Sequence, residues 1–232
     1  MSAIVAALIA LLFSIAGAGA SDVNPDMLPM FGQPKITRPE NLQKVDDAFI
    51  RDNTFRYKSR QAASNAFAAQ GWGAVRTKQL DVAMLRFNQA WLLNPKNYSA
   101  FWGFGAVLSD QGRLGEAIEQ LETARELIDD PAQRSALLTD LGAVHSEYAA
   151  SLPAERQLER AQRFVLANSR FSESLENDPS FAPGWREWAI SLYQQERYAE
   201  AWLRVKRARE LRAEPFPPEF IDKLSAKMAE PK

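Results

Sequence analysis

The sequence contains no cysteine and only one histidine, His145, among its 232 residues. Without cysteine the chain forms no disulfide, offers no thiolate nucleophile or lipoprotein acylation site, and builds no cysteine-based zinc or iron–sulfur site. A lone histidine also excludes every site that needs two imidazoles. We therefore expect no bound metal ion and no cofactor.

An excess of charge of one sign is also missing. The 28 Lys and Arg residues nearly balance the 29 Asp and Glu residues, which gives a formal net charge of −1. This balance provides no general attraction to nucleic acid or to an anionic membrane. No glycine-rich phosphate loop follows a strand, and His145 has no identifiable nucleophile partner, so we expect it to pack between helices. We predict no catalytic residue and no enzymatic activity.

Residues 1–20 carry no charge at all. An apolar run from Ile4 to Ile15 leads into small residues, and Ala18 and Ala20 form an A-x-A-like cleavage site. We predict a signal peptide cleaved after Ala20, which makes the remainder periplasmic or secreted. No Lys or Arg precedes the run, so an uncleaved membrane anchor is the alternative, although the run is short for a span of about 20 residues.

Prolines interrupt residues 21–45, where we expect an extended segment, because each proline removes a backbone donor and crowds the preceding turn. They are Pro25, Pro29, Pro34 and Pro39, with Gly32 as a further break. The segment also carries an apolar cluster that is unusual for a spacer, made of Met27, Leu28, Met30 and Phe31. Either the cluster packs on the first helices, or it docks on a partner through adaptable methionine side chains.

Helical patterns begin after Pro39, and no convincing alternating strand pattern is present. Asn41 is a candidate cap for a helix that runs to about Asp52, and Ser59 is a candidate cap for the next helix. We assign 46–63 to an N-terminal helical lead-in.

From residue 64 onward the sequence repeats with a period of 34 residues. Gly71 aligns with Gly105 at this spacing. Further pairs are Ala83 with Ala117, Phe87 with Leu121, Ala90 with Ala124, Ala167 with Ala201, Phe171 with Val205 and Ser174 with Ala208. Here the sequence resembles the tetratricopeptide-repeat (TPR) family, whose unit is a 34-residue helix–turn–helix. The resemblance implies an all-α fold, a right-handed TPR α-solenoid with N-terminal helices and a C-terminal capping helix.

The repeat can be followed through four units. We place them at 64–97, 98–131, 132–181 and 182–215, with a capping helix and tail at 216–232. A small residue in each first helix, such as Gly71, lets the two helices of a unit cross closely, and a large residue such as Phe87 fills the gap to the next unit. No unit buries its apolar face alone, so we expect the units to stack.

The third unit departs from the period. Ala167 follows Gly142 by 25 residues, whereas 12 residues separate the same positions in the first two units. We expect a turn near Pro153, one long helix over 154–176, and a hairpin that protrudes beyond its neighbours. The extra length is either a harmless variation or a contact surface for a homodimer or a partner.

Residues 219–229 follow a proline-rich turn and read as a short amphipathic helix. Its apolar face carries Phe220, Ile221, Leu224 and Met228. We predict that this helix caps the exposed end of the array.

In TPR proteins the first helix of each unit lines a concave groove, so the resemblance implies a set of partner-binding positions. They are Asn65, Trp72 and Arg76, then Trp102 and Asp110, then Glu147, and finally Arg186, Ile190, Tyr193 and Gln194, with Ser99, Ser109, Thr139 and Ser146 as smaller polar positions. Tryptophan, tyrosine and arginine are enriched among the residues that dominate binding energies. Core packing is the competing interpretation of each tryptophan, whereas the charged side chains should face water.

Some TPR domains hold a C-terminal carboxylate with a Lys/Asn clamp, but this sequence has Ala68 and Trp72 at those positions. An extended peptide or a helix along the aromatic groove fits better. We expect a non-catalytic interaction scaffold or adaptor of the bacterial cell envelope. The alternative is a dedicated inhibitor or immunity-type protein that binds one exported enzyme or toxin.

Overall fold

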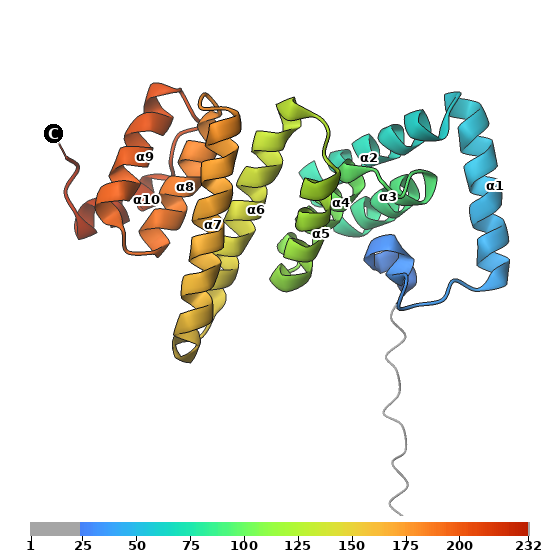
Figure 1. The fold of residues 1–232 in the computed structure, drawn as a ribbon, viewed down its shortest axis with the longest axis horizontal. Coiled ribbons are helices and arrows are strands. Elements are labelled where there is room, and N and C mark those ends of the chain that lie inside the picture. The colour runs from blue at the N-terminus through green and yellow to red at the C-terminus, as the bar shows by residue number, and fades with distance from the viewer. Residues whose placement is uncertain (1–23, 232) are drawn as a thin grey trace, which may run out of the picture.

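The computed structural model describes residues 24–231, and these residues form ten α-helices, three short 3₁₀ helices and no strand (Figure 1). The α-helices are α1 (Glu40–Tyr57), α2 (Arg60–Arg76), α3 (Leu80–Leu93), α4 (Tyr98–Asp110), α5 (Leu114–Leu127), α6 (Pro131–Ser151), α7 (Gln157–Asn177), α8 (Ala182–Gln194), α9 (Tyr198–Glu210) and α10 (Pro218–Lys227). The 3₁₀ helices are η1 (Pro25–Met27), η2 (Pro29–Gly32) and η3 (Ala154–Arg156). The expected signal peptide, 1–20, lies outside the described residues.

Consecutive helices pair into four hairpins, α2 with α3, α4 with α5, α6 with α7, and α8 with α9. Neighbouring hairpins touch through α3 and α4, through α5 and α6, and through α6 and α8. The result is an elongated array that runs from α1 at one end to α10 at the other (Figure 1). The predicted all-α solenoid of helix–turn–helix units is therefore confirmed.

Phe87 in α3 shows how the helices of the array approach one another. Its ring is fully buried and lies against Gly71 of α2 in its own hairpin and against Gly103 of α4 in the next. A Cβ atom at Gly71 would stand 2.6 Å from Phe87 Cε1, and one at Gly103 would stand 2.2 Å from the same atom. A side chain at either position would force the ring or a helix to move. The close crossing predicted at Gly71 is present.

The start of α2 follows its local sequence, whereas α1 does not. Ser59 Oγ accepts a hydrogen bond from the backbone N–H of Ala62, which confirms the predicted cap of α2. The prediction for α1 is wrong at both ends. Asn41 lies inside the first turn of the helix, and the helix continues to Tyr57 and ends at Lys58, which adopts a left-handed conformation with a φ of 70°.

Residues 24–38, which we call the N-terminal strap, pack on the array. Phe31 is buried, and Asn88 of α3 is fully buried beneath the strap. Asn88 Oδ1 accepts from the Phe31 N–H at 3.1 Å, and its Nδ2 donates to the carbonyl oxygens of Asp26 and Leu28. Of the two interpretations of the apolar cluster, packing on the helices is confirmed. The strap is not fully extended, since η1 and η2 form single turns that begin at prolines, as 3₁₀ turns allow.

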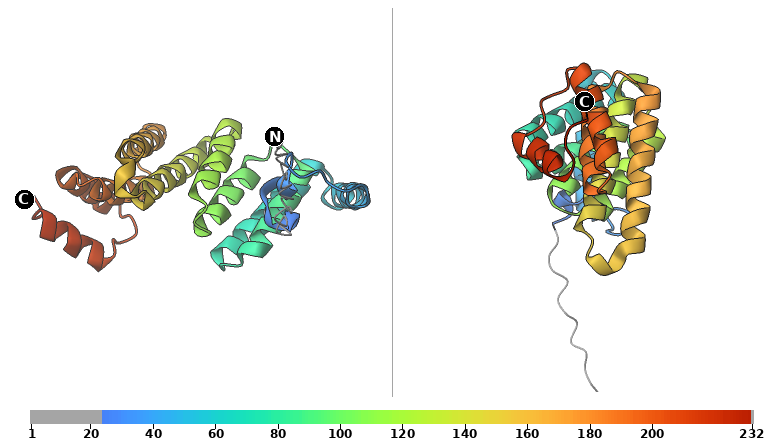
Figure 2. Two further views of the ribbon diagram at one scale, coloured as in Figure 1. Left: turned by 90° about the horizontal axis from the view of Figure 1, so that it is seen from below. Right: turned by 90° about the vertical axis from the view of Figure 1, so that its left-hand side faces the viewer.

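The third hairpin is longer than its neighbours. Its helices α6 and α7 have 21 residues each, and its tip extends past the other hairpins (Figures 1 and 2). The expected helix over 154–176 begins later than predicted, because residues 154–156 form η3 after Pro153. α7 then runs from Gln157 to Asn177.

α10 packs on α8 and α9 at the end of the array. Leu224 is fully buried there, and Phe220 and Ile221 pack beside it. Met228 departs from the prediction, because it is the C-cap residue and its side chain is 38% exposed. Its carbonyl oxygen accepts a hydrogen bond from Trp202 Nε1 at 2.9 Å, so the backbone of this residue, not its side chain, fastens the cap.

Candidate functional site: a groove along the first helices

A large cavity beside the first helices lies between α2, the start of α4 and the α5–α6 turn. Its volume is about 900 Å³. Side-chain amides and hydroxyls are prominent in its wall, so we call it the amide pocket. It is lined by Gln61, Asn65, Ala68, Ala69, Trp72, Asn94, Lys96, Asn97, Tyr98, Ser99, Leu127, Asp129 and Asp130.

Hydrogen bonds fix the amides of this wall. Gln61 accepts from Asn94 Nδ2 at 2.6 Å and donates from its own Nε2 to Asn65 Oδ1 at 2.9 Å. Asn97, which is buried, donates to Ser64 Oγ at 2.7 Å. Because each amide carries both a donor and an acceptor, such a wall can bind the N–H and C=O groups of an extended peptide.

A second cavity of about 260 Å³ follows between α4, α6 and the end of α2. Three carboxylates line it, so we call it the acidic pocket. Its lining residues are Val75, Lys78, Trp102, Ala106, Ser109, Asp110, Leu121, Asp140, Ala143, Val144 and Glu147.

Two tryptophans join the pockets. Trp72 lines the amide pocket and Trp102 lines the acidic pocket, and their rings meet edge to face at 5.3 Å between centroids. Trp72 Nε1 donates to Ser99 Oγ at 2.9 Å, and Trp102 Nε1 donates to Asp140 Oδ2 at 2.8 Å. The two cavities are therefore consecutive parts of one groove with an aromatic pair between them.

Asp140 is the electrostatically unusual residue of the groove. The surrounding protein partly desolvates the carboxyl and raises its pKa to about 6. The residue as a whole is nevertheless exposed within the groove. The hydrogen bond from Trp102 opposes this rise, and the negative charge of Glu187 adds to it. An ionised Asp140 is therefore short of compensating positive charge.

The structure brings five of the predicted site residues together around this groove. They are Asn65 and Trp72 in the amide pocket, and Trp102, Asp110 and Glu147 in the acidic pocket. Arg76 is exposed at the end of α2 and lines neither pocket. Ser99 and Ser109 also line the groove, whereas Thr139 and Ser146 are buried between helices.

The four positions predicted on α8 lie elsewhere. Arg186 does not face water as expected: its side chain is 19% exposed, pairs with Glu187, and lies 5.7 Å from the Phe216 ring centroid. Tyr193 packs against Tyr198 and the capping residue Phe220, because α10 covers this end of the array. Ile190 is half-buried, and Gln194 accepts a hydrogen bond from Ser146 Oγ at 2.8 Å. Arg186, Tyr193 and Gln194 therefore make contacts within the array.

Sequence reasoning missed Asp140 and the amides around Asn97. Asp140 falls outside the usual groove positions of the TPR pattern, and the Asn97 contacts join residues more than thirty positions apart. One signal was available for Asp140. It stands seven residues before Glu147 with only small or apolar residues on the helix face between them, namely Ala143 and Val144.

His145 packs inside the array, 2% exposed, as its interpretation as a packing residue requires. Its Nε2 lies 4.0 Å from Glu122 Oε1, beyond hydrogen-bond length. The pKa of Glu122 is lowered to about 2 by His145 and then by its direct contacts with Arg125 and Arg170. This cluster joins α5, α6 and α7 away from the groove.

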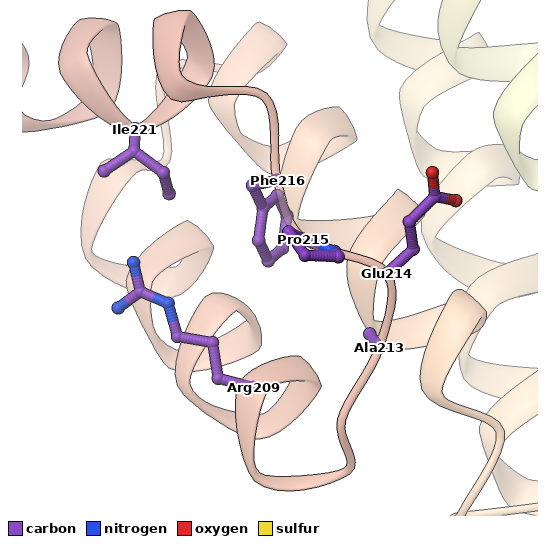
Figure 3. A pocket seen from close by; sticks show the side chains of 6 residues that line it. All are labelled: Arg209, Ala213, Glu214, Pro215, Phe216 and Ile221. Carbon is purple, nitrogen blue, oxygen red and sulfur yellow. The ribbon is translucent and has the colours of Figure 1, made fainter.

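Another cavity, of about 280 Å³, lies beside the C-terminal cap. Figure 3 shows its lining, in which Arg209 of α9 and Ile221 of α10 face each other across the opening and Phe216 comes from the connecting loop. Arg209 pairs with Glu230, so its charge is already compensated. With no further convergent polar groups, this cavity is a weaker candidate than the groove.

Within residues 24–231, no three His, Asp or Glu side chains gather as a metal site would require, and no helix combines the length and apolarity needed to cross a membrane. No protein-family model matches the chain, and no curated protein matches it.

Among solved structures, the chain is similar to the crystal structure of YrrB, described as a TPR protein with an unusual peptide-binding site. The identity is 19% and the TM-score 0.33, over 78% of this chain and 97% of that chain. The described helices pair into consecutive hairpins with small residues such as Gly71 at the crossings, so the fold is an α-solenoid of helix–turn–helix units.

Proposed function

We propose that the protein is a non-catalytic scaffold or adaptor that binds a peptide or protein partner along the groove formed by the amide and acidic pockets. One observation carries this proposal: two cavities on the first helices meet at the Trp72–Trp102 pair. Fixed amides beside the half-buried ring of Trp72 offer main-chain hydrogen bonds together with apolar contact, which peptide recognition uses.

The proposed setting is the bacterial cell envelope. It rests on the signal-peptide prediction for 1–20, which lies outside the described residues. A dedicated inhibitor of one exported enzyme would use the same groove, and it would differ by having a single, slowly dissociating partner.

A second copy of the chain is a further candidate partner, through the third hairpin. Leu158 and Val165 lie seven residues apart on the outer face of α7, and they are 76% and 66% exposed. Large apolar side chains that stay exposed on one helix face are a feature of contact surfaces.

Affinity capture from an envelope extract tests the choice between the two surfaces. The full-length chain is compared with a groove variant, Asn65→Ala with Trp72→Ala, and with a hairpin variant, Leu158→Ser with Val165→Ser. We expect a partner that the wild type and the hairpin variant retain and the groove variant loses, with all three folded by circular dichroism. Loss in the hairpin variant alone would refute the groove proposal.

A further inference from the structure

The acidic pocket is the more acidic part of the groove, because three carboxylates and one lysine line it, whereas Asp129 and Asp130 line the amide pocket together with Lys96. Asp140 and Glu147 of α6 line it together with Asp110 of α4. Its one basic lining residue, Lys78, is already engaged, because Lys78 Nζ lies 2.7 Å from Asp110 Oδ2. Among the described residues, no Lys or Arg forms an ion pair with Asp140 or Glu147. Asp140 and Glu147 are therefore available to pair with a cation from a partner.

Apart from Ser109, the rest of the wall is apolar. Val75, Val144 and the Trp102 ring surround the approach to the carboxylates, and Trp102 is only 8% exposed. A long side chain with a methylene stem and a cationic head matches this combination, since the stem contacts apolar surface while the head reaches the oxygens. Trp102 also orients Asp140 by donating its indole N–H to Oδ2, which leaves Oδ1 open.

Lys78 shows, within this molecule, that a lysine side chain can reach a carboxylate of this pocket. From the turn between α2 and α3 its ammonium already reaches Asp110 at the rim of this pocket. The side chain is 73% exposed, so this pair is a weak surface contact. A cation deeper in the pocket, beside Trp102, would be less screened by water.

We propose that the acidic pocket receives a lysine or arginine side chain of the groove-bound partner, held by Asp140 and Glu147 against Trp102. The proposal rests on the proposed function, which it deepens by naming the partner's chemistry: an extended segment with a basic residue. A neutral or acidic segment would leave both carboxylates without a counter-charge.

The electrostatics support this assignment. The charged groups around Asp140 are Glu147 on its own helix, Asp110 of α4, Lys78 of the α2–α3 turn and Glu187 of α8, and carboxylates predominate among them. A bound cation would favour the ionised carboxyl. Because the pKa of free Asp140 is raised to about 6, affinity for a basic segment should fall as the pH drops through 6.

Two synthetic decapeptides test the proposal, one with lysine at alternate positions in a Gly/Ser frame and one with norleucine, which keeps the stem and lacks the charge. Each is titrated into the full-length ¹⁵N-labelled chain, and the Trp102 indole resonance is followed, assigned by Trp102→Phe. We expect the lysine peptide to shift this resonance and to bind at least about tenfold tighter than the norleucine peptide.

The Asp140→Asn, Glu147→Gln double variant should lose that tenfold advantage, because the new amide oxygen at position 140 can still accept from Trp102 while the charge is gone. The matched control is Glu119→Gln with Glu126→Gln, two exposed carboxylates of α5 that line neither pocket. Equal affinity for both peptides, or equal loss in the control, would overturn the proposal. If the norleucine peptide binds equally well and its binding depends on Trp72, the groove remains the binding site and the basic side chain in the acidic pocket is refuted. If neither peptide binds, the result counts against both the groove proposal and the acidic-pocket proposal.

Discussion

Single residues decide where the groove is polar and where the strap attaches. Asn88 is fully buried on α3 and is satisfied by the main chain of residues that precede it by about sixty positions. Asp140 is held by one indole N–H in a wall with little positive charge. Neither role is visible in the sequence, because the partners of both side chains are distant along the chain and are brought together only by the stacking of helices.

Replacement of Asn88 tests the attachment of the strap. We expect Asn88→Ala to lower the free energy of unfolding by about 2–3 kcal/mol, because the N–H of Phe31 and two carbonyl groups lose their partner. Urea denaturation measures this, with Asn53→Ala in α1 as a control whose amide makes one bond within its own helix. Limited proteolysis should also cut the Asn88 variant within 24–38 first. Equal stability of both variants would show that the strap contributes nothing.

Asp140 gives a prediction with a definite sign. The pKa of Asp140 in the folded protein, about 6, is above the ordinary 3.8, so the folded state favours the protonated carboxyl. Below pH 4 the carboxyl is protonated in both states and its contribution to stability is fully present. This contribution is lost as the pH rises through 6 and the carboxyl ionises. Asp140→Asn should therefore gain stability relative to the wild type between pH 4.5 and pH 7.5, because the amide cannot ionise. Urea midpoints of both proteins at the two pH values provide the measurement. A difference independent of pH would show that Asp140 is well solvated.

At the scale of elements, the repeat spacing predicts which helices pair, because close crossings need glycine or alanine at fixed positions in both helices. Gly71 was expected at the crossing of α2 and α3 and touches Phe87 there, and Phe87 also fills the gap to the next hairpin at Gly103, as expected. The bounds of α1 could not be predicted in the same way, because no side chain caps its start. Of the α8 positions expected in the groove, Tyr193 instead packs against Phe220 of α10, since a capping helix is not part of the repeat pattern.

The crossing at Gly71 has a matched control in the same helix. Gly71→Ala should destabilise the protein by about 1–3 kcal/mol, because its Cβ would stand 2.6 Å from the Phe87 ring. In Gly73→Ala the new methyl group meets only Arg76 Nη2, at 3.8 Å, so a neutral or stabilising change of up to about 1 kcal/mol is expected. Thermal denaturation compares them. Adding Phe87→Leu to Gly71→Ala should recover part of the loss, and equal effects of the two alanines would contradict this packing.

At the scale of the whole molecule, the array offers two surfaces of different character. The groove is polar and aromatic, with fixed amides and unpaired carboxylates. The third hairpin reaches beyond the array and exposes Leu158 and Val165. Because the strap is folded onto α3, its apolar cluster is already used within the molecule, and the groove and the hairpin are the stronger candidates for a partner.

If the third hairpin forms a homodimer, its outer face has to be apolar. Leu158→Glu with Val165→Glu should then convert a dimer into a monomer in light scattering after gel filtration, because two like charges would face each other in a symmetric contact. A wild-type protein that is monomeric at high concentration would refute the dimer and leave the groove proposal unaffected.

Site-specific photocrosslinking in the living cell tests the central claim most directly. A photoreactive phenylalanine analogue replaces Ala69, an exposed residue of α2 that lines the amide pocket, or Ser169, an exposed residue of α7. We predict a discrete crosslinked partner from position 69 and none from position 169. A partner crosslinked from position 169 and absent from position 69 would contradict the groove as the binding surface.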